Sequence, residues 1–386
     1  MTSVVVGGPL ANKAYNGGIA WNVISYVLGL KKLGFRVYLV EEMAAENCVD
    51  RNGSIVSFDA SENLAYFHAI TEAFGLSDAA LLYDGGAQVY GSSPDELRMR
   101  AEEAALLINI SGHLALGWVF GRIPCKVYID EDPGFTQFWQ ASGDSGIHLV
   151  GHDFYYTVGE NVGEPGCSVP TNGIPWRPIR QPVVLDEWPV APSPRPPRFT
   201  TVASWRGPYG QVEYEGQRFG LKVHEFRKFV ALPERTSFSF EIALDIHPDD
   251  HRDLALLRNH GWRVIEPGTV AGDPQGYRRY VQGSGAEFSV AQGIYVDTGS
   301  GWFSDRSARY LASGKPVLLQ DTGFSRNLPT GQGLLAFCDL DDAVAGTERI
   351  ASDYDQHSRA ARALAEEYFD SDKVLGRLLE AVGVSP

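Results

Sequence analysis

Residues 297–323 constrain the fold more than any other segment, because they join a glycine-rich turn, a capped helix and an apolar strand. Ser304 occupies the position expected of a helix N-cap, and the pattern predicts a helix from near Asp305 to just before Gly314. The run at 317–319 is apolar throughout, which is typical of a buried strand in a parallel sheet. The segment therefore predicts an α/β fold.

The start of this helix has the chemistry of an anion site. Free backbone N–H groups and the positive end of the helix dipole point back into the turn, an arrangement that suits a diphosphate. The strand that follows delivers its last side chains to the edge where open α/β sheets bind ligands. The candidate ligand contacts are Ser304, Asp305, Arg306, Ser307, Asp321 and Thr322. The alternative is an ordinary helix–strand corner with a solvated Asp–Arg pair.

The same segment resembles the donor-binding part of GT-B glycosyltransferases, which are two-domain enzymes that use nucleotide sugars. The matching residues are Ala-Ser-Gly-Lys-Pro-Val at 312–317 and Asp-Thr-Gly at 321–323. A second match lies at 201–206 and 219–226. It resembles the strand, arginine, loop, lysine and helix that open the donor domain in the glycogen-synthase-like branch.

The resemblance implies a fold and a set of donor contacts. The fold is α/β and GT-B, with two Rossmann-like parallel-sheet domains facing each other across a cleft. Arg206 and Lys222 would clamp the diphosphate, whose negative charge grows as it departs, although each alone also fits a solvated surface cation. Glu266 lies where this fold meets the nucleobase, with Trp262 or Tyr277 as a stacking side chain or a core aromatic.

One departure from the family pattern limits this transfer of roles. The glycogen-synthase-like branch has two glutamates eight positions apart, one near the sugar and one on the ribose. The corresponding positions here hold Gly301 and Arg309, and neither is acidic. Asp305, Asp321 or Glu287 would have to substitute. The sequence therefore leaves open whether the anomeric configuration is retained or inverted.

Apolar runs and turn signals arrange the chain as two βα arrays. Strands are predicted at 4–6, 36–40, 81–83, 106–110, 126–129 and 155–158, and then at 199–203, 238–244, 263–265, 293–296 and 316–319. An N-terminal acceptor-binding domain is predicted over 1–185, a proline-rich linker over 186–197 and a donor-binding domain over 198–355. The helical tail at 356–386 is expected to cross back onto the first domain.

The first domain offers candidates for a catalytic base and for a further donor contact. His113 and Asp132 each follow a predicted strand, where an imidazole or carboxylate can remove a proton from an acceptor hydroxyl. A histidine bonded to a neighbouring turn and a solvated acidic turn are the alternatives. Asn16, Gly17 and Gly18 can open a helix and approach the donor, because glycine lets backbone amides come close.

The composition restricts the partners. A formal net charge of -15 disfavours nucleic acid or an anionic membrane as the main ligand. No apolar run approaches the ~20 residues of a membrane span. The four cysteines are scattered, as expected for reduced thiols in a cytoplasmic protein, and no metal or cofactor is expected besides the nucleotide sugar. The sequence does not decide the oligomeric state and is compatible with a homodimer.

These observations favour one function over three others. The preferred hypothesis is a metal-independent glycosyltransferase that moves a sugar from a nucleotide diphosphate to a small-molecule or glycan acceptor. A nucleotide-sugar epimerase and a non-catalytic sugar-nucleotide-binding homologue are the alternatives on the same architecture. A dinucleotide oxidoreductase fits less well, because Gly7-Gly8-Pro9 lacks the Gly-x-Gly-x-x-Gly spacing and proline removes an amide that a pyrophosphate needs.

Overall fold

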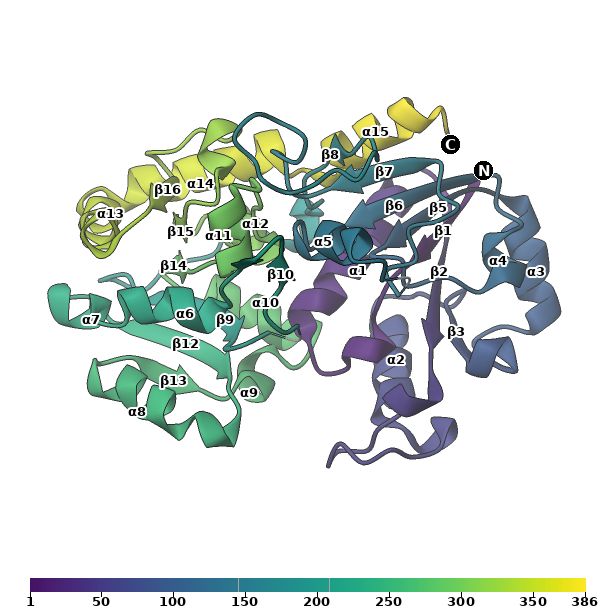
Figure 1. Cartoon of the computed structure of the whole chain (residues 1–386), viewed down its shortest axis with the longest axis horizontal. Coiled ribbons are helices and arrows are strands. Elements are labelled where there is room, and N and C mark those ends of the chain that lie inside the picture. The colour runs from purple at the N-terminus through teal and green to yellow at the C-terminus, as the bar shows by residue number, and fades with distance from the viewer. Residues whose placement is uncertain (145, 208) are drawn as a thin grey trace.

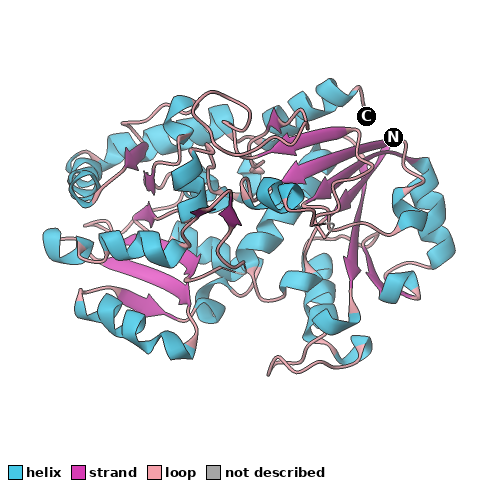
Figure 2. Ribbon diagram, viewed as in Figure 1, coloured by secondary structure: helices cyan, strands magenta, loops and turns pink. Residues whose placement is uncertain are grey.

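Two sheets organise the chain, and helices surround the strands of each (Figure 2). The computed structural model describes residues 1–144, 146–207 and 209–386. In these residues an eight-stranded sheet has the order β4-β3-β2-β1-β5-β6-β7-β8, and a six-stranded sheet has the order β13-β12-β9-β14-β15-β16. Every neighbouring pair is parallel except β3 and β4. The two sheets lie side by side in Figure 1.

The first sheet has short, apolar strands that are buried over most of their length. Its strands are β1 (Ser3–Gly7), β2 (Arg36–Met43), β3 (Ala80–Tyr83), β4 (Gln88–Tyr90), β5 (Ala104–Ile110), β6 (Cys125–Asp130), β7 (Phe154–Thr157) and β8 (Arg177–Pro178). Its helices are α1 (Gly17–Lys32), α2 (Glu62–Ala73), α3 (Pro94–Glu103), α4 (Gly117–Phe120) and α5 (Phe135–Ala141). All six strands predicted for this half are present.

The second sheet comprises β9 (Phe199–Ser204), β12 (Phe240–Asp245), β13 (Arg263–Ile265), β14 (Ala286–Ser289), β15 (Val317–Gln320) and β16 (Leu334–Phe337), with a separate hairpin of β10 (Glu213–Tyr214) and β11 (Gln217–Arg218). Its helices are α6 (Lys222–Phe226), α7 (Leu232–Arg235), α8 (His251–Asn259), α9 (Pro267–Ala271), α10 (Pro274–Gln282), α11 (Gly293–Thr298), α12 (Asp305–Ala312) and α13 (Leu340–Ser352).

The strand predicted at 293–296 is wrong, because these residues begin α11. The strand in this part of the sheet is β14, seven residues earlier in the chain. Gly293 packs against the backbone of Gly220, where an added Cβ would lie 2.7 Å from the carbonyl oxygen. Since this contact comes from a distant segment, the β-branched run alone indicated the wrong structure.

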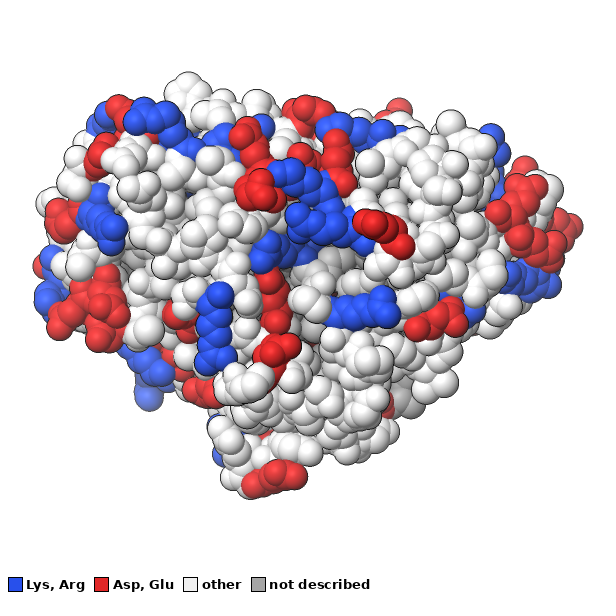
Figure 3. Space-filling model, turned by 90° about the horizontal axis from the view of Figure 1, so that it is seen from above, with Lys and Arg blue, Asp and Glu red and all other residues white. Residues whose placement is uncertain are grey.

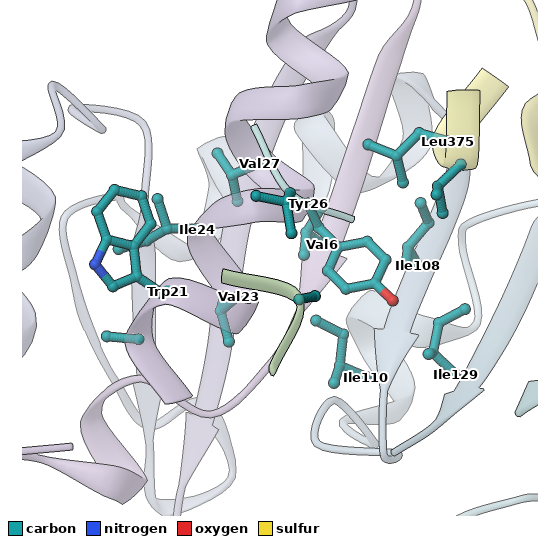
Figure 4. Close-up of a cluster of buried hydrophobic side chains, with 14 of the residues drawn as sticks. Val6, Trp21, Val23, Ile24, Tyr26, Val27, Ile108, Ile110, Ile129 and Leu375 are labelled. Atoms are coloured by element: carbon teal, nitrogen blue, oxygen red, sulfur yellow. The ribbon is translucent and has the colours of Figure 1, made fainter. Parts of the chain in front are cut away.

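Helix α1 connects the core of the first sheet with the other half of the molecule. Asn16 caps the helix by accepting a hydrogen bond from the Ile19 amide at 3.1 Å. Figure 4 shows apolar side chains of α1 packed with those of β1, β5 and β6. Helix α1 is also approached closely by the C-terminal part of the chain. An added Cβ at Gly29 of α1 would lie 2.6 Å from the Leu375 side chain.

The C-terminal helices span both halves. Helix α14 (Tyr354–Tyr368) packs on α12, whereas α15 (Ser371–Val382) packs on α1, and the chain ends beside its N-terminus (Figure 1). The proline-rich segment is fastened to the second half, because the Lys315 ammonium donates to the carbonyl oxygens of Ala191 and Pro192 and to the Ser193 hydroxyl at 2.7–2.9 Å. The domain boundaries stay a prediction. No helix among the described residues is both long and apolar enough to cross a membrane.

Candidate functional site

A pocket of about 520 Å³ lies between the two halves, at the carboxyl ends of β9, β12 and β13. The loop before α1 and the first turn of that helix form the opposite wall. The pocket is lined by six of the predicted donor contacts, which are Asn16, Gly18, Lys222, Glu266, Asp305 and Arg306. The carboxyl edge of a parallel sheet is where ligands of open α/β folds bind. We call this cavity the interdomain pocket.

Arg306 is held rigidly in the wall of this pocket. Its guanidinium donates to Glu287 Oε1 at 2.5 Å, to the Val202 carbonyl at 2.8 Å and to the Ser289 hydroxyl at 2.6 Å. Glu287 is fully buried, and the Arg306 side chain is 13% exposed. Glu287 therefore orients the Arg306 guanidinium and balances its charge, and a contact of Glu287 with a ribose or sugar stays a prediction.

Lys222 is the second cation of the interdomain pocket. Its ammonium donates to the Val290 carbonyl at 2.6 Å, and its backbone amide donates to Gln292 Oε1 at 2.6 Å. Burial, assisted by the nearby Arg306 and opposed by Glu287, lowers the pKa of Lys222 to about 7. Near neutral pH this side chain is poised to gain a proton when an anion approaches.

The predicted N-terminus of α12 is present, and Ser304 accepts a hydrogen bond from the Arg306 amide at 3.2 Å. Asp305 also lines the pocket, but Arg309 donates to its carboxylate at 2.6 Å. The Ser307 side chain is fully buried, and its hydroxyl has no hydrogen-bond partner among the described residues. The first turn therefore supplies amides and an arginine, while its carboxylate is already paired.

The segment at 16–18 joins the two halves. Gly17 is pressed against the second half, where an added Cβ would lie 2.3 Å from the Asp273 carbonyl oxygen. At Gly18 the same atom would lie 3.2 Å from the ring of Tyr277. Only glycine allows this approach of the backbone, so these positions set the spacing between α1 and α10.

Glu266 caps α9 and lines the pocket beside Pro267. Of the two predicted stacking side chains, Tyr277 lines the pocket, whereas Trp262 lies in the core with its indole N–H donating to the Val230 carbonyl at 2.8 Å. Ser204 and Asp245 also line the pocket and were not predicted. Ser204 and Asp245 are the last residues of β9 and β12. Predicting where each strand ends would therefore have identified them.

Besides Gly17, Ser304 and Ser307, three more predicted contacts do not line the interdomain pocket. Arg206 is half exposed and forms a two-bonded ion pair with Asp250 at 2.5 and 2.9 Å. Asp321 accepts from the Gly323 amide at 2.8 Å, and Thr322 donates to the Trp302 carbonyl at 2.6 Å. The last two shape the turn that follows β15. Donor binding by these three residues stays a prediction.

Asp132 lies between the two halves. Its carboxylate accepts hydrogen bonds from the hydroxyls of Tyr295 at 2.9 Å and Tyr209 at 3.4 Å. Burial raises the pKa of Asp132 to about 6, while the bond from Tyr295 opposes that shift. Both carboxylate oxygens are thus engaged by the second half, and a role as base stays a prediction.

His113 lines a cavity of about 400 Å³ in the first half, together with His148 and Asn47. Burial lowers the pKa of His113 to about 4, so the imidazole is neutral at pH 7. A larger cavity of about 670 Å³ shares Asn12 and Asn47 with it and shares Tyr15 and Asn16 with the interdomain pocket. The three cavities therefore form a series along the first half.

The two positions that carry glutamates in the glycogen-synthase-like branch are structural here. At Gly301 an added Cβ would lie 2.8 Å from the Asn161 side chain, so this packing has no room for a carboxylate. Arg309 is fully buried, and its guanidinium lies 6.0 Å from the ring of Trp188. Neither position therefore offers a carboxylate to a ligand. Within the described ranges, no group of three or more His, Cys, Asp or Glu is placed to hold a metal ion.

Comparisons with known proteins establish the fold. No family model and no curated protein matches the sequence. Sucrose-phosphate synthase from Thermosynechococcus elongatus is similar over 99% of both chains, with a TM-score of 0.59 and 11% identity. An alpha-glucosyltransferase in complex with UDP matches 99% of this chain and 100% of its own, with a TM-score of 0.63 and 10% identity.

A third solved structure is Anabaena HepE in complex with UDP and glucose. It matches 99% of this chain and 100% of its own, with a TM-score of 0.58 and 10% identity. These matches span essentially the whole chain, as the predicted two-domain architecture requires. The chain therefore has the GT-B fold, and the predicted fold class is confirmed.

Proposed function

We propose that the protein is a glycosyltransferase that takes a sugar from a nucleotide-diphosphate donor and transfers it to a small-molecule or glycan acceptor. The observation that carries this proposal is the interdomain pocket, where Lys222 and Arg306 face Asn16 and Gly18 across the gap between the sheets. Two structural neighbours were solved with UDP. A uridine diphosphate sugar is therefore the first donor to test.

The proposed chemistry follows from charge. Breaking the sugar–phosphate bond leaves a diphosphate whose negative charge increases, and Lys222, Arg306 and the amides at the start of α12 are positioned to stabilise it. Lys222 takes up a proton from solvent when the diphosphate binds, because its pKa in the free protein is about 7. In this proposal these groups supply the stabilisation that a divalent ion supplies in other transferases.

The acceptor is proposed to occupy the two cavities of the first half. Their walls carry amides and both signs of charge, including Asn12, Lys13, Asn47 and Arg51, which suits a hydroxyl-rich acceptor. His113 is the favoured base, because it lines one of these cavities and its imidazole is neutral at pH 7. Asp132 is the second candidate.

The test is thermal stabilisation of the purified protein by UDP, TDP, GDP and nicotinamide dinucleotides, with EDTA present. A shift with one nucleoside diphosphate supports the proposal and identifies the base. Lys222→Ala should lower that affinity by about tenfold or more, since a hydrogen bond to a charged group contributes about 1.5–3 kcal/mol. The matched control is Arg235→Ala, which removes a half-exposed cation of α7 that does not line the pocket.

The same panel separates the alternatives. No shift, or a shift only with a dinucleotide, would overturn the proposal in favour of an oxidoreductase or a protein without a donor site. Incubating the protein with the sugar form of the selected nucleotide and a panel of sugar acceptors then distinguishes a transferase from an epimerase or a non-catalytic homologue. Detected transfer excludes the last two as the whole function, whereas a changed donor without transfer supports the epimerase.

A further inference from the structure

A fourth cavity, of about 510 Å³, lies at the β8 edge of the first sheet, between β7, β8 and the C-terminal helices. It shares no lining residue with the interdomain pocket or with the two cavities beside it. Its floor and one wall are apolar and come from Ile179, Val374, Leu378 and Ala381. We call it the edge cavity.

Three arginines and one glutamate line the edge cavity. Arg180 is paired through two bonds of 2.7 and 2.9 Å with Glu160, so these two charges cancel. Neither Arg177 nor Arg377 forms an ion pair or side-chain hydrogen bond with any residue in the ranges that the structure describes. The cavity therefore keeps two guanidinium groups without a bonded partner, of which Arg377 is partly balanced by the nearby Glu367, on a chain whose formal net charge is -15.

The free guanidinium of Arg177 is held in place. It lies 5.0 Å from the ring of Phe154 and 6.0 Å from the ring of Tyr156, within the range of cation–π contact. Figure 3 looks down on the face that carries the C-terminal helices and shows Lys and Arg side chains near its middle, with Asp and Glu side chains beside them. An arginine fixed on aromatic rings presents its planar donors with little loss of freedom on binding an oxyanion.

Tyr156 provides an independent observation. It lines the edge cavity, its side chain is 5% exposed, and its hydroxyl is buried without a hydrogen-bond partner among the described residues. Buried hydroxyls in folded proteins nearly always have a partner, because leaving one unpaired costs free energy. The hydroxyl is covered, so a ligand oxygen in the edge cavity reaches it only when a neighbouring side chain shifts, and it is then free to donate a hydrogen bond.

We propose that the edge cavity binds a phosphate monoester carrying a short apolar body. Arg177 and Arg377 face the doubly charged phosphate, the Tyr156 hydroxyl donates to one of its oxygens, and the apolar body packs on Val374 and Leu378. Guanidinium groups recognise phosphate through paired N–H donors, which suits a dianion. The proposal is independent of the function proposed for the interdomain pocket, with which this cavity shares no residue.

The test is calorimetric titration of the full chain with hexyl phosphate, with inorganic phosphate and hexanol as controls. Saturable binding of hexyl phosphate at least tenfold tighter than that of inorganic phosphate is expected. The Arg177→Ala/Arg377→Ala double variant should weaken it at least tenfold, and Tyr156→Phe should weaken it several-fold without unfolding the protein. Arg359→Ala, at an exposed position on α14, is the matched control and should leave binding unchanged.

Two further experiments test where hexyl phosphate binds and whether the natural ligand is a lipid or a soluble molecule. Lys222→Ala should bind hexyl phosphate like the parent, since Lys222 lies in the interdomain pocket. Flotation of the protein with phosphatidic acid vesicles, lost in the double variant, would identify a lipid headgroup, whereas hexyl phosphate binding without flotation would identify a soluble ligand. No hexyl phosphate binding, equal binding by the double variant, or loss in Lys222→Ala would overturn the proposal.

Discussion

The two halves of the molecule present different kinds of surface to the space between them. In the second half, the charged groups of the interdomain pocket are paired from behind: Glu287 holds Arg306 and Arg309 holds Asp305. In the first half, the adjoining cavities are lined by loop residues such as Asn47 and Arg51, most of them exposed or partly exposed. One half holds its charged groups in fixed pairs, whereas the other is a loop surface whose chemistry can vary without changing the sheet.

This difference indicates which half would determine the specificity for the nucleotide and which half the specificity for the acceptor. The donor side is fixed by buried networks, since a cation held at three points cannot be moved without disturbing β9 and β14. In the first half the buried Glu41 carboxylate accepts from the backbone amides of Ala11 and Asn12 at 2.6 and 2.8 Å, so its network fixes the backbone of the loops and not a cation in the cavity wall. In GT-B terms we expect the nucleotide to be recognised rigidly and the acceptor to be recognised by the loops of the first half.

The largest expected effect separates catalysis from donor binding. His113→Ala should lower kcat by about 10²–10⁴-fold, the usual contribution of a general base, because alanine cannot take the proton and His148, which lines the same cavity, is at another position. Affinity for the donor nucleotide should change by less than about twofold, since His113 does not line the interdomain pocket. Steady-state kinetics and calorimetry measure the two quantities. If His113→Ala also weakened nucleotide binding, the prediction that His113 acts in catalysis and not in donor binding would be wrong.

The second prediction concerns the buried ion pair of the donor side. Arg306→Ala leaves the fully buried Glu287 carboxylate without its partner and should lower the free energy of unfolding by about 3–5 kcal/mol. Urea denaturation measures this. Adding Glu287→Gln should recover part of the stability but not nucleotide binding.

Arg206→Ala is the matched control for that experiment, because its pair with Asp250 is half exposed and should contribute about 0–1 kcal/mol. If both arginine variants lose the same stability, the network behind the donor site does not have the strength inferred here.

The sequence predicted the donor side well where its information is local. Ser304, Arg306 and the strand at 317–319 follow from a cap, a helix and an apolar run, and each is in the expected place. Strand β14 was missed because Glu287 and Ser289 interrupt its apolar pattern. Both are polar because they bind Arg306, so the site itself concealed the strand.

Other parts of the site depend on partners that no local pattern reveals. Arg206 has the family spacing of a phosphate clamp, yet Asp250, 44 residues later, draws its guanidinium away from the pocket. Asp132 similarly meets Tyr209 and Tyr295 only because the two halves are packed together. The series of cavities in the first half arises from loops brought together by the sheet, and sequence spacing did not indicate it.

The third prediction is a pH dependence that belongs to the donor side alone. Below pH 7 Lys222 is already protonated and nucleotide-sugar affinity is highest, while above pH 7 binding must take up a proton, so affinity falls as pH rises. Between pH 7 and 8 the dissociation constant should rise by up to about tenfold, measured by calorimetry with a nucleotide sugar, whose diphosphate does not titrate in this range. Lys222→Ala should flatten the profile, and an unchanged slope would assign the titration to another group.

The smallest effects compare the two helix caps that face the interdomain pocket. Asn16→Ala and Ser304→Ala each remove a side-chain oxygen that accepts a backbone N–H, at α1 and α12 respectively. Each should lower the free energy of unfolding by about 1 kcal/mol in urea denaturation. Ser93→Ala, which removes the cap of α3 away from the pocket, is the reference. A change near zero at Asn16 would mean that packing against the second half alone fixes the start of α1.

The central claim is that a nucleotide diphosphate binds between the two halves, and a crystal structure of the protein soaked with UDP tests it most directly. The account predicts density for the diphosphate against Lys222 and Arg306, with the nucleobase beside Glu266. Density for UDP elsewhere on the chain, or an empty interdomain pocket at saturating UDP, would contradict it.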